Sequence, residues 1–251
     1  MKHTPNQIGC VTATNRVARG YTLLELLISL VILATVSGAV FEQINHMQTR
    51  SSSEAMKLDM NQQAREFLDQ TVRDLHMAGY PGASMYSNPL LFPSKVAAGL
   101  VRVSPSEILL EGDVNNDGSV YSVDIYLQAS DSTDSNCPCI RRSAHAKVDA
   151  DSFSQPSSPN YTETQRVFPP GTGTGQSGED LFAYYDQNGN PVNIGSGVDI
   201  STPAGEFTPT GKDLIATIKT VKINLSLLSQ PDPESKGLIR TSMSATARLN
   251  N

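Results

Sequence analysis

The sequence lacks the motifs that mark the common hydrolytic enzymes. It has neither a G-x-S-x-G nor an H-E-x-x-H pattern, and only 4 of its residues are histidine. His3 lies near the start, and His46 and His76 fall in a stretch that we interpret as helical below. A nucleophile elbow and a pair of metal-binding histidines are therefore both missing, and we expect no enzymatic activity.

Positive charge is also scarce. The chain has 19 lysines and arginines against 25 acids, a formal charge of −6. Three of the positive charges, Lys2, Arg16 and Arg19, lie in residues 1–20, which hold no acid, so the remainder carries −9. A chain with no basic patch cannot neutralise phosphates, and we expect no nucleic acid partner.

Cysteine is rare, with 3 in the chain. Cys10 lies in the first twenty residues, and Cys137 and Cys139 form a C-P-C sequence. An oxidising compartment would let the last two pair as a local disulfide, although the loop between them is too short to staple a large segment. Two free thiols remain the alternative. Metal binding is disfavoured, because only His145 lies near them.

The most distinctive feature that the sequence does contain is one long apolar run. Residues 21–41, YTLLELLISLVILATVSGAVF, hold a single acid, Glu25. As a helix this run would span roughly 30 Å, the thickness of a bilayer core. The basic leader, residues 1–20, has no apolar segment of its own, so it is not an ordinary signal peptide, which is cut after its apolar segment.

The presence of a carboxylate, Glu25, within such an apolar run requires a physical explanation. A carboxylate costs about 2.5–3.5 kcal/mol at the centre of a membrane helix and less near the interface, where Glu25 would lie. Inside a dry bundle of apolar helices it must find a cation.

The stretch RGYTLLELLISLVILA resembles the N-terminal signature of type IV pilins, pseudopilins and minor pilins. The resemblance implies that prepilin peptidase cuts between Gly20 and Tyr21 and that the amine of Tyr21 is then methylated. It also implies that Glu25 pairs with the N-terminal amine of a neighbouring subunit. Tyr21 departs from the family's commonest residue, phenylalanine, but keeps its aromatic character.

Looser similarities, in RDLHMAGYPG, FAYYDQNGNP and the ending ATARLNN, resemble the PilW or PulJ type of minor pilin. They imply a low-abundance subunit that initiates or caps a filament. The partners implied are prepilin peptidase, other major and minor pilins or pseudopilins, the inner-membrane assembly platform and membrane lipid.

The helical pattern continues through residues 42–79. No proline or glycine interrupts residues 42–78, and Gly79 and Pro81 are typical of a helix end. Apolar residues recur at mostly three- and four-residue steps and predict one buried face: Ile44, Met47, Ala55, Leu58, Phe67, Leu68, Val72 and Leu75. The charges opposite, which include Asp69 and Asp74, we interpret as solvated.

Residues 80–251 change to a period of two, with turn-rich pieces between short strands. They predict an antiparallel β head that packs on the soluble half of the long helix, and hence an α+β fold. Two strands near the end alternate clearly, one with Val221 and Ile223 facing inward and one with Met243 and Ala245. Residues 131–180, rich in Ser, Thr, Pro and Gly, we interpret as a loop-rich surface insertion.

A possible calcium loop lies at residues 113–124, DVNNDGSVYSVD. Asp113, Asn115, Asp117 and the following glycine repeat the first half of such a loop, and Asp124 takes the place of its bidentate glutamate. The alternative is a β-hairpin with residues 116–118 in the turn. Calcium is the one cofactor that the sequence suggests.

Three functions follow from these observations. The first is a minor pilin of a type IV pilus, inserted in the inner membrane with its leader cytoplasmic and its head exported, because positive charge stays inside. The second is a minor pseudopilin of a type II secretion system. The third is a membrane-anchored exported enzyme or binding module.

Overall fold

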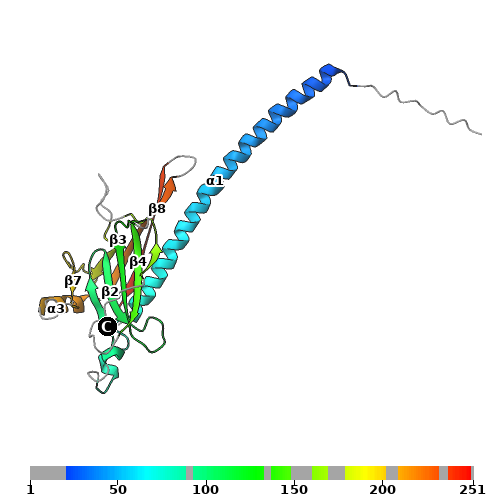
Figure 1. Cartoon of the computed structure of the whole chain (residues 1–251). Helices are drawn as coiled ribbons and strands as arrows, with labels where there is room; N and C mark the ends of the chain where they lie inside the picture. The colour runs from blue at the N-terminus through cyan, green and yellow to red at the C-terminus, as the bar shows by residue number, and fades with distance from the viewer. Residues whose placement is uncertain are drawn as a thin grey trace, which may run out of the picture. The chain divides into compact units, whose positions relative to one another are not determined.

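The structure is a computed structural model, and it describes residues 21–88, 93–132, 137–147, 160–168, 179–201, 209–231 and 237–249. The chain divides into two compact units after Thr49. The fold is α+β, as predicted, with one long N-terminal helix and an antiparallel β domain (Figure 1).

Helix α1 runs from Leu23 to Met77. Its end follows the prediction, because Gly79 adopts the left-handed conformation with φ 82°, which favours glycine. The amide of Tyr80 then donates to the carbonyl of Met77 at 3.1 Å, and the amide of Gly79 donates to Glu111 at 2.9 Å. The helix therefore ends directly against a strand of the head.

The buried face of α1 differs in part from the prediction. Phe67, Leu68 and Leu75 are buried, as expected. Ile44, Met47 and Leu58, by contrast, are 42, 68 and 70% exposed. Apart from Met60, the side chains that complete the buried face in their place are smaller or polar: Ser53, Ala64, Thr71 and Asp74.

The described strands form two antiparallel sheets. One has the order β5-β4-β3-β2-β1-β7, and Figure 1 shows β2, β3 and β4 side by side within it. Its strands are β1 (Gly99–Val103), β2 (Glu107–Gly112), β3 (Tyr121–Gln128), β4 (Cys139–Ala146), β5 (Asn160–Thr164) and β7 (Val198–Asp199). The other has the order β6-β8-β9, with β6 (Phe182–Tyr185), β8 (Thr220–Pro231) and β9 (Leu238–Arg248).

Short helical segments complete the described fold. They are the 3-10 turns η1 (Ala83–Met85) and η3 (Pro93–Lys95), and helix α3 (Pro209–Thr217). Helix α3 was not expected from the sequence, because Gly211 weakens its helical pattern. Ile215, near its end, is nevertheless buried in the shared core.

One hydrophobic core joins α1 and both sheets. Its largest fully buried side chains come from the second half of α1, from the strands of the six-stranded sheet, from β6 and β8 and from the link before β8: Leu75, Leu100, Ile108, Leu109, Leu110, Ile125, Ile140, Phe182, Ile218, Ile223, Leu225 and Leu227. The inward alternation of Val221 and Ile223 along β8 is confirmed. The head thus folds around the second half of α1 as a single packed body.

The interpretation of residues 131–180 as a loop-rich insertion is wrong for residues 139–146 and 160–164, which form strands β4 and β5. Strand β4 lies within the six-stranded sheet, paired along its length with β3, and β5 pairs with β4 at the edge. The apolar pattern of β4 is hidden because Arg142 occupies the position opposite Ile125. Residues 133–136, 148–159 and 169–178 of the predicted insertion lie outside the described residues.

Arg142 forms an ion pair with Asp74, an acid that the sequence pattern led us to interpret as solvated. Its Nε donates to Asp74 Oδ2 at 2.9 Å, and Asp74 is only 1% exposed, so this acid of α1 is not solvated charge. Burial raises the pKa of Asp74, and Arg142 opposes that shift. Gln70 also donates to Asp74 Oδ1 at 2.9 Å. The pair fixes α1 against β4.

We predict that Asp74→Ala lowers the free energy of unfolding by about 3 kcal/mol, because Arg142 would keep its charge in a largely buried place without this carboxylate. Glu163 interacts electrostatically with both Asp74 and Arg142, and its remaining charge near Arg142 limits the loss of stability. Replacing both residues, as Asp74→Leu with Arg142→Met, should cost less than the single change. Urea unfolding of the detergent-solubilised chain measures both.

The control is Asp69→Ala, an exposed acid on the same helix, which should change the free energy of unfolding by no more than about 0.5 kcal/mol. Equal losses for Asp69→Ala and Asp74→Ala would contradict the assignment of the ion pair.

Candidate functional site

The first candidate site is the start of α1. Thr22 caps the helix, since its Oγ1 accepts from the amide of Glu25 at 3.3 Å and its carbonyl accepts from Leu26 at 3.2 Å. Glu25 therefore lies in the first turn, where a negative charge is favoured by the helix dipole. Tyr21 precedes the cap and is 79% exposed. Gly20 lies outside the described residues.

The Glu25 carboxylate is exposed, and among the described residues no side chain pairs with it. Its apolar neighbours are exposed as well, and the most apolar 18-residue window of α1 has none of its residues buried. By length and composition, α1 is able to cross a membrane. This part of the chain thus offers an apolar surface with a single carboxylate near its start.

Two of the hydroxyl groups within the apolar run, those of Ser29 and Thr35, are already satisfied. Ser29 Oγ donates to the carbonyl of Leu26 at 2.9 Å, and Thr35 Oγ1 donates to Ile32 at 2.9 Å. Such bonds to the helix's own backbone let hydroxyls reside in apolar surroundings. Glu25 is the one charged side chain of this run, and among the described residues it has no partner.

The loop of the predicted calcium site is a β-hairpin turn. Asp113 accepts from the amides of Asp117 at 3.0 Å and Gly118 at 2.9 Å. Asp117 accepts from the amide of Ser119 and from the hydroxyl of Tyr121, both at 2.8 Å. The bond from Tyr121 lowers the pKa of Asp117. The carboxylates are thus used to shape the turn, as in the hairpin alternative.

Asp124 does not complete a set of ligands with this loop. Gly112 pairs with Tyr121 at the base of the turn, whereas Asp124 pairs with Leu109, three residues further along β3. At about 3.3 Å per residue this separates it from the loop by roughly 10 Å. In the part of the chain that the structure describes, no group of three or more His, Cys, Asp or Glu could hold a metal ion. Calcium binding by Asp113, Asn115 and Asp117 stays a prediction.

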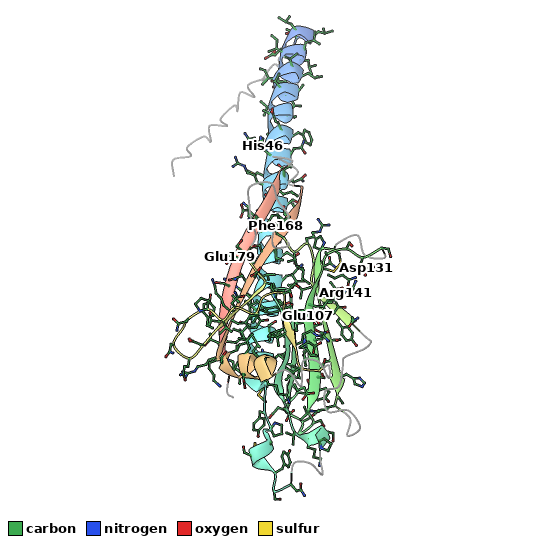
Figure 2. The ribbon with its side chains drawn as sticks, turned by 90° about the vertical axis from the view of Figure 1, so that its left-hand side faces the viewer. His46, Glu107, Asp131, Arg141, Phe168 and Glu179 are labelled. Carbon is green, nitrogen blue, oxygen red and sulfur yellow. A yellow bond between two sulfur atoms is a disulfide. The ribbon has the colours of Figure 1, made fainter. Side chains whose placement is uncertain are left out.

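Asp124 instead belongs to a cluster of three carboxylates around Arg102. Arg102 forms an ion pair with Glu107, which Figure 2 labels, and its Nε lies 2.8 Å from Asp199 Oδ2. Asp124 Oδ1 is buried and has no hydrogen-bond partner. Burial, followed by the charge of Glu107, raises the pKa of Asp124 to about 7. Sequence reasoning missed this cluster, because only the strand register brings its members together.

The pair Cys137 and Cys139 forms a disulfide. Cys139 begins β4 and is buried, so the bond lies where β4 enters the sheet. Its partner lies two residues earlier, so the closed loop is small.

We predict that Asp124 makes stability fall as pH rises from about 4 to about 7. Its folded pKa is about 7 against an ordinary value of 3.8, so in this window the folded state holds a proton that the unfolded state has lost. The slope from one such proton is at most about 1.4 kcal/mol per pH unit. Asp124→Asn, which imitates the protonated acid, should flatten it.

Urea unfolding of the detergent-solubilised chain at pH 5 and pH 8 measures this slope. Asp186→Asn is the control, because hydrogen bonds from Asn190 lower the pKa of this exposed acid, which titrates below the window. An unchanged slope in Asp124→Asn would show that another group is responsible.

Comparison with known proteins agrees with the geometry of the N-terminal segment. Residues 15–41 match the family model described as the prokaryotic N-terminal methylation motif. No curated protein and no solved structure matches the chain. The chain therefore carries a prepilin-type methylation motif on an apolar helix, and at this end it is type IV pilin-like.

Proposed function

We propose that this chain is a minor pilin of a type IV pilus. Its precursor is inserted in the inner membrane, and prepilin peptidase cuts between Gly20 and Tyr21 and methylates the new amine. The assembly platform then moves the subunit into a filament with other major and minor pilins, which it helps to initiate or cap. Its role is structural, and the motif at residues 15–41 supports this over enzymatic function.

The observation that carries the proposal is Glu25, which has no partner among the described residues and lies on an otherwise apolar helix surface. In the bilayer, a carboxylate in the first helical turn can reach the interface. Among packed apolar helices it has no such route, and it requires a cation. Cleavage at Gly20 creates that cation on every subunit, namely the Tyr21 amine, which a neighbouring Glu25 can bind.

The pairing of Glu25 with the Tyr21 amine also determines how neighbouring subunits are positioned along the bundle. A carboxylate and an amine in a water-poor bundle attract one another more strongly than they would in water. A subunit displaced along the bundle would leave both charges buried and unpaired, which is strongly unfavourable. Glu25 thereby favours one axial position of each new subunit.

Two further features support an exported head. The leader carries Lys2, Arg16 and Arg19 without acids, and positive charge beside a span stays cytoplasmic. The disulfide of Cys137 and Cys139 is of a kind that persists in oxidising compartments.

A minor pseudopilin of a type II secretion system is the second candidate, because the same methylation motif serves both systems. Neighbouring genes for pilus retraction and assembly would favour the pilus, and genes for a secretin with secretion pseudopilins would favour the second candidate. A membrane-anchored exported enzyme or binding module is the third, and hydrolase activity in the intact chain would support it.

We predict that the protein isolated from its native membrane begins at Tyr21 and carries one added methyl group. Intact mass and N-terminal sequencing, with and without prepilin peptidase, measure this. A chain that keeps residues 1–20, or that is cut beyond Ala39, would make this segment an ordinary anchor or signal and would contradict the filament proposal.

We predict that Glu25→Ala leaves membrane insertion intact and lowers incorporation into filaments at least about tenfold. Insertion is not weakened, because the change removes a charge from the apolar run. Incorporation suffers because the Tyr21 amine of the neighbour loses its partner. Immunoblots of membrane and sheared-filament fractions measure both quantities.

Glu42→Ala is the matched control, since it removes an exposed acid from the same helix beyond the apolar run. It should enter filaments as the unmodified chain does. Normal incorporation of Glu25→Ala would disprove the pairing while leaving the cleavage result untouched.

A further inference from the structure

Strand β9 forms a long open edge of the three-stranded sheet. The sheet order is β6-β8-β9, so among the described strands β9 has β8 as its one neighbour. The two pair without a shift in register from Thr220 opposite Arg248 to Leu228 opposite Arg240. Figure 2 shows them running side by side as a long hairpin.

The register decides which main-chain groups of β9 face outward. The amide of Leu249 donates to Lys219 at 2.9 Å, and that of Ile239 donates to Ser229 Oγ at 2.9 Å, so the odd-numbered residues of β9 turn their main-chain groups toward β8. In an antiparallel pair these groups alternate in direction along the strand. The amides and carbonyls of Ser242, Ser244 and Thr246 therefore point to the open side.

The opposite edge of β8 shows the same alternation. There, Phe168 donates to the carbonyl of Ser226 at 2.8 Å and Leu228 donates to Arg166 at 2.9 Å. Even-numbered residues of β8 thus bond away from β9, and residues 166–168 cover part of that edge. The outer edge of β9 has no equivalent cover among the described strands.

The edge also lacks the usual protection. Natural edge strands are kept from pairing by shortness, proline, charged side chains or a bulge. Residues 241–247 contain neither proline nor a charged side chain, and the register is unbroken from Arg248 to Arg240, beyond which it shifts before Leu238. The other strands that end a sheet are shorter, with 5 residues in β5, 2 in β7 and 4 in β6. An open strand of 11 residues is a template for another strand.

The charges of β9 argue against a second copy of the chain that pairs along the full length of this strand. Antiparallel pairing of two β9 edges centred on Ser244 would set Arg240 opposite Arg248 of the other copy at both ends. In-register parallel pairing would set each arginine beside its own equivalent. Like charges directly opposite one another are destabilising.

We propose that the outer edge of β9 binds an extended segment of a different polypeptide, with carboxylates near Arg240 and Arg248. Arg240 lies over the ring of Phe168, 4.6 Å from its centroid, and donates to Ser226 at 3.2 Å, so its charge is held on the sheet surface. Arg248 is exposed at the other end of the strand. The bound segment therefore carries two acids eight positions apart. This interface does not depend on the proposed pilus function.

Photo-cross-linking in the native host tests the interface in the full-length chain. Ser242 is replaced by p-benzoylphenylalanine, and the cross-linked peptide is identified by mass spectrometry. The backgrounds compared are Ser244→Pro, Ser244→Ala and Arg248→Glu. Proline at residue 244 removes an outward amide and leaves the ladder with β8 intact, whereas alanine keeps the amide.

The expected result is a cross-link to an acidic segment of a different polypeptide. It is retained in Ser244→Ala and reduced at least about tenfold in Ser244→Pro and in Arg248→Glu. A cross-link to a second copy of the chain, no cross-link, or equal yields in the proline and alanine variants would overturn the proposal.

Thermal unfolding checks that each variant folds. Should Ser244→Pro not fold, Thr246→Pro with Thr246→Ala repeats the comparison at the next outward position. Arg248→Glu tests the charge requirement without any proline substitution. An unchanged cross-link yield in that variant would overturn this requirement.

Discussion

The head depends on the close contact between the end of α1 and strand β2. A Cβ atom on Gly112 would lie 2.3 Å from the carbonyl oxygen of Met77, so only glycine permits this approach. The amide of Asp113 donates to Tyr80 at 2.9 Å beside it, and Ala78 forms a β-bridge with Gly112. The end of the helix is thereby hydrogen-bonded to the sheet at β2, and this junction sets how the hydrophobic core packs between them.

Charged groups hold the same junction in place. Glu111 and Lys147 form a buried pair at 2.6 Å, and Glu111 also accepts from the amide of Ala98 at 3.0 Å. A buried pair of this kind is costly unless both members are satisfied, and Lys147 meets a further acceptor in the carbonyl of Val96 at 3.0 Å. The loop after α1 and the end of β4 are thus tied to β2 by polar contacts.

The sequence predicts the fold well wherever one face of an element is apolar. The long helix and the alternation along β8 follow from the spacing of apolar residues, and the helix end follows from Gly79 and Pro81. Strand β4 was missed because Arg142 and Asp74 replace an apolar contact, and a pattern of apolar residues does not reveal a buried ion pair. The motif around Glu25 could be recognised from the sequence because its residues are adjacent. The members of the Arg102 cluster lie on different strands, and the strand register that brings them together is not apparent from the sequence alone.

The hydroxyls of Ser29 and Thr35 are bonded to their own helix, and this affects how a subunit could pass from lipid into a filament. In the proposed assembly neither group needs to exchange partners, so these two hydrogen bonds stay as they are. Under the proposed pairing, the charged groups whose surroundings change are the Glu25 carboxylate and the Tyr21 amine. The stagger of adjacent subunits would accordingly depend on a single ionic contact, while the apolar surface around it lets the helices slide until that contact is made.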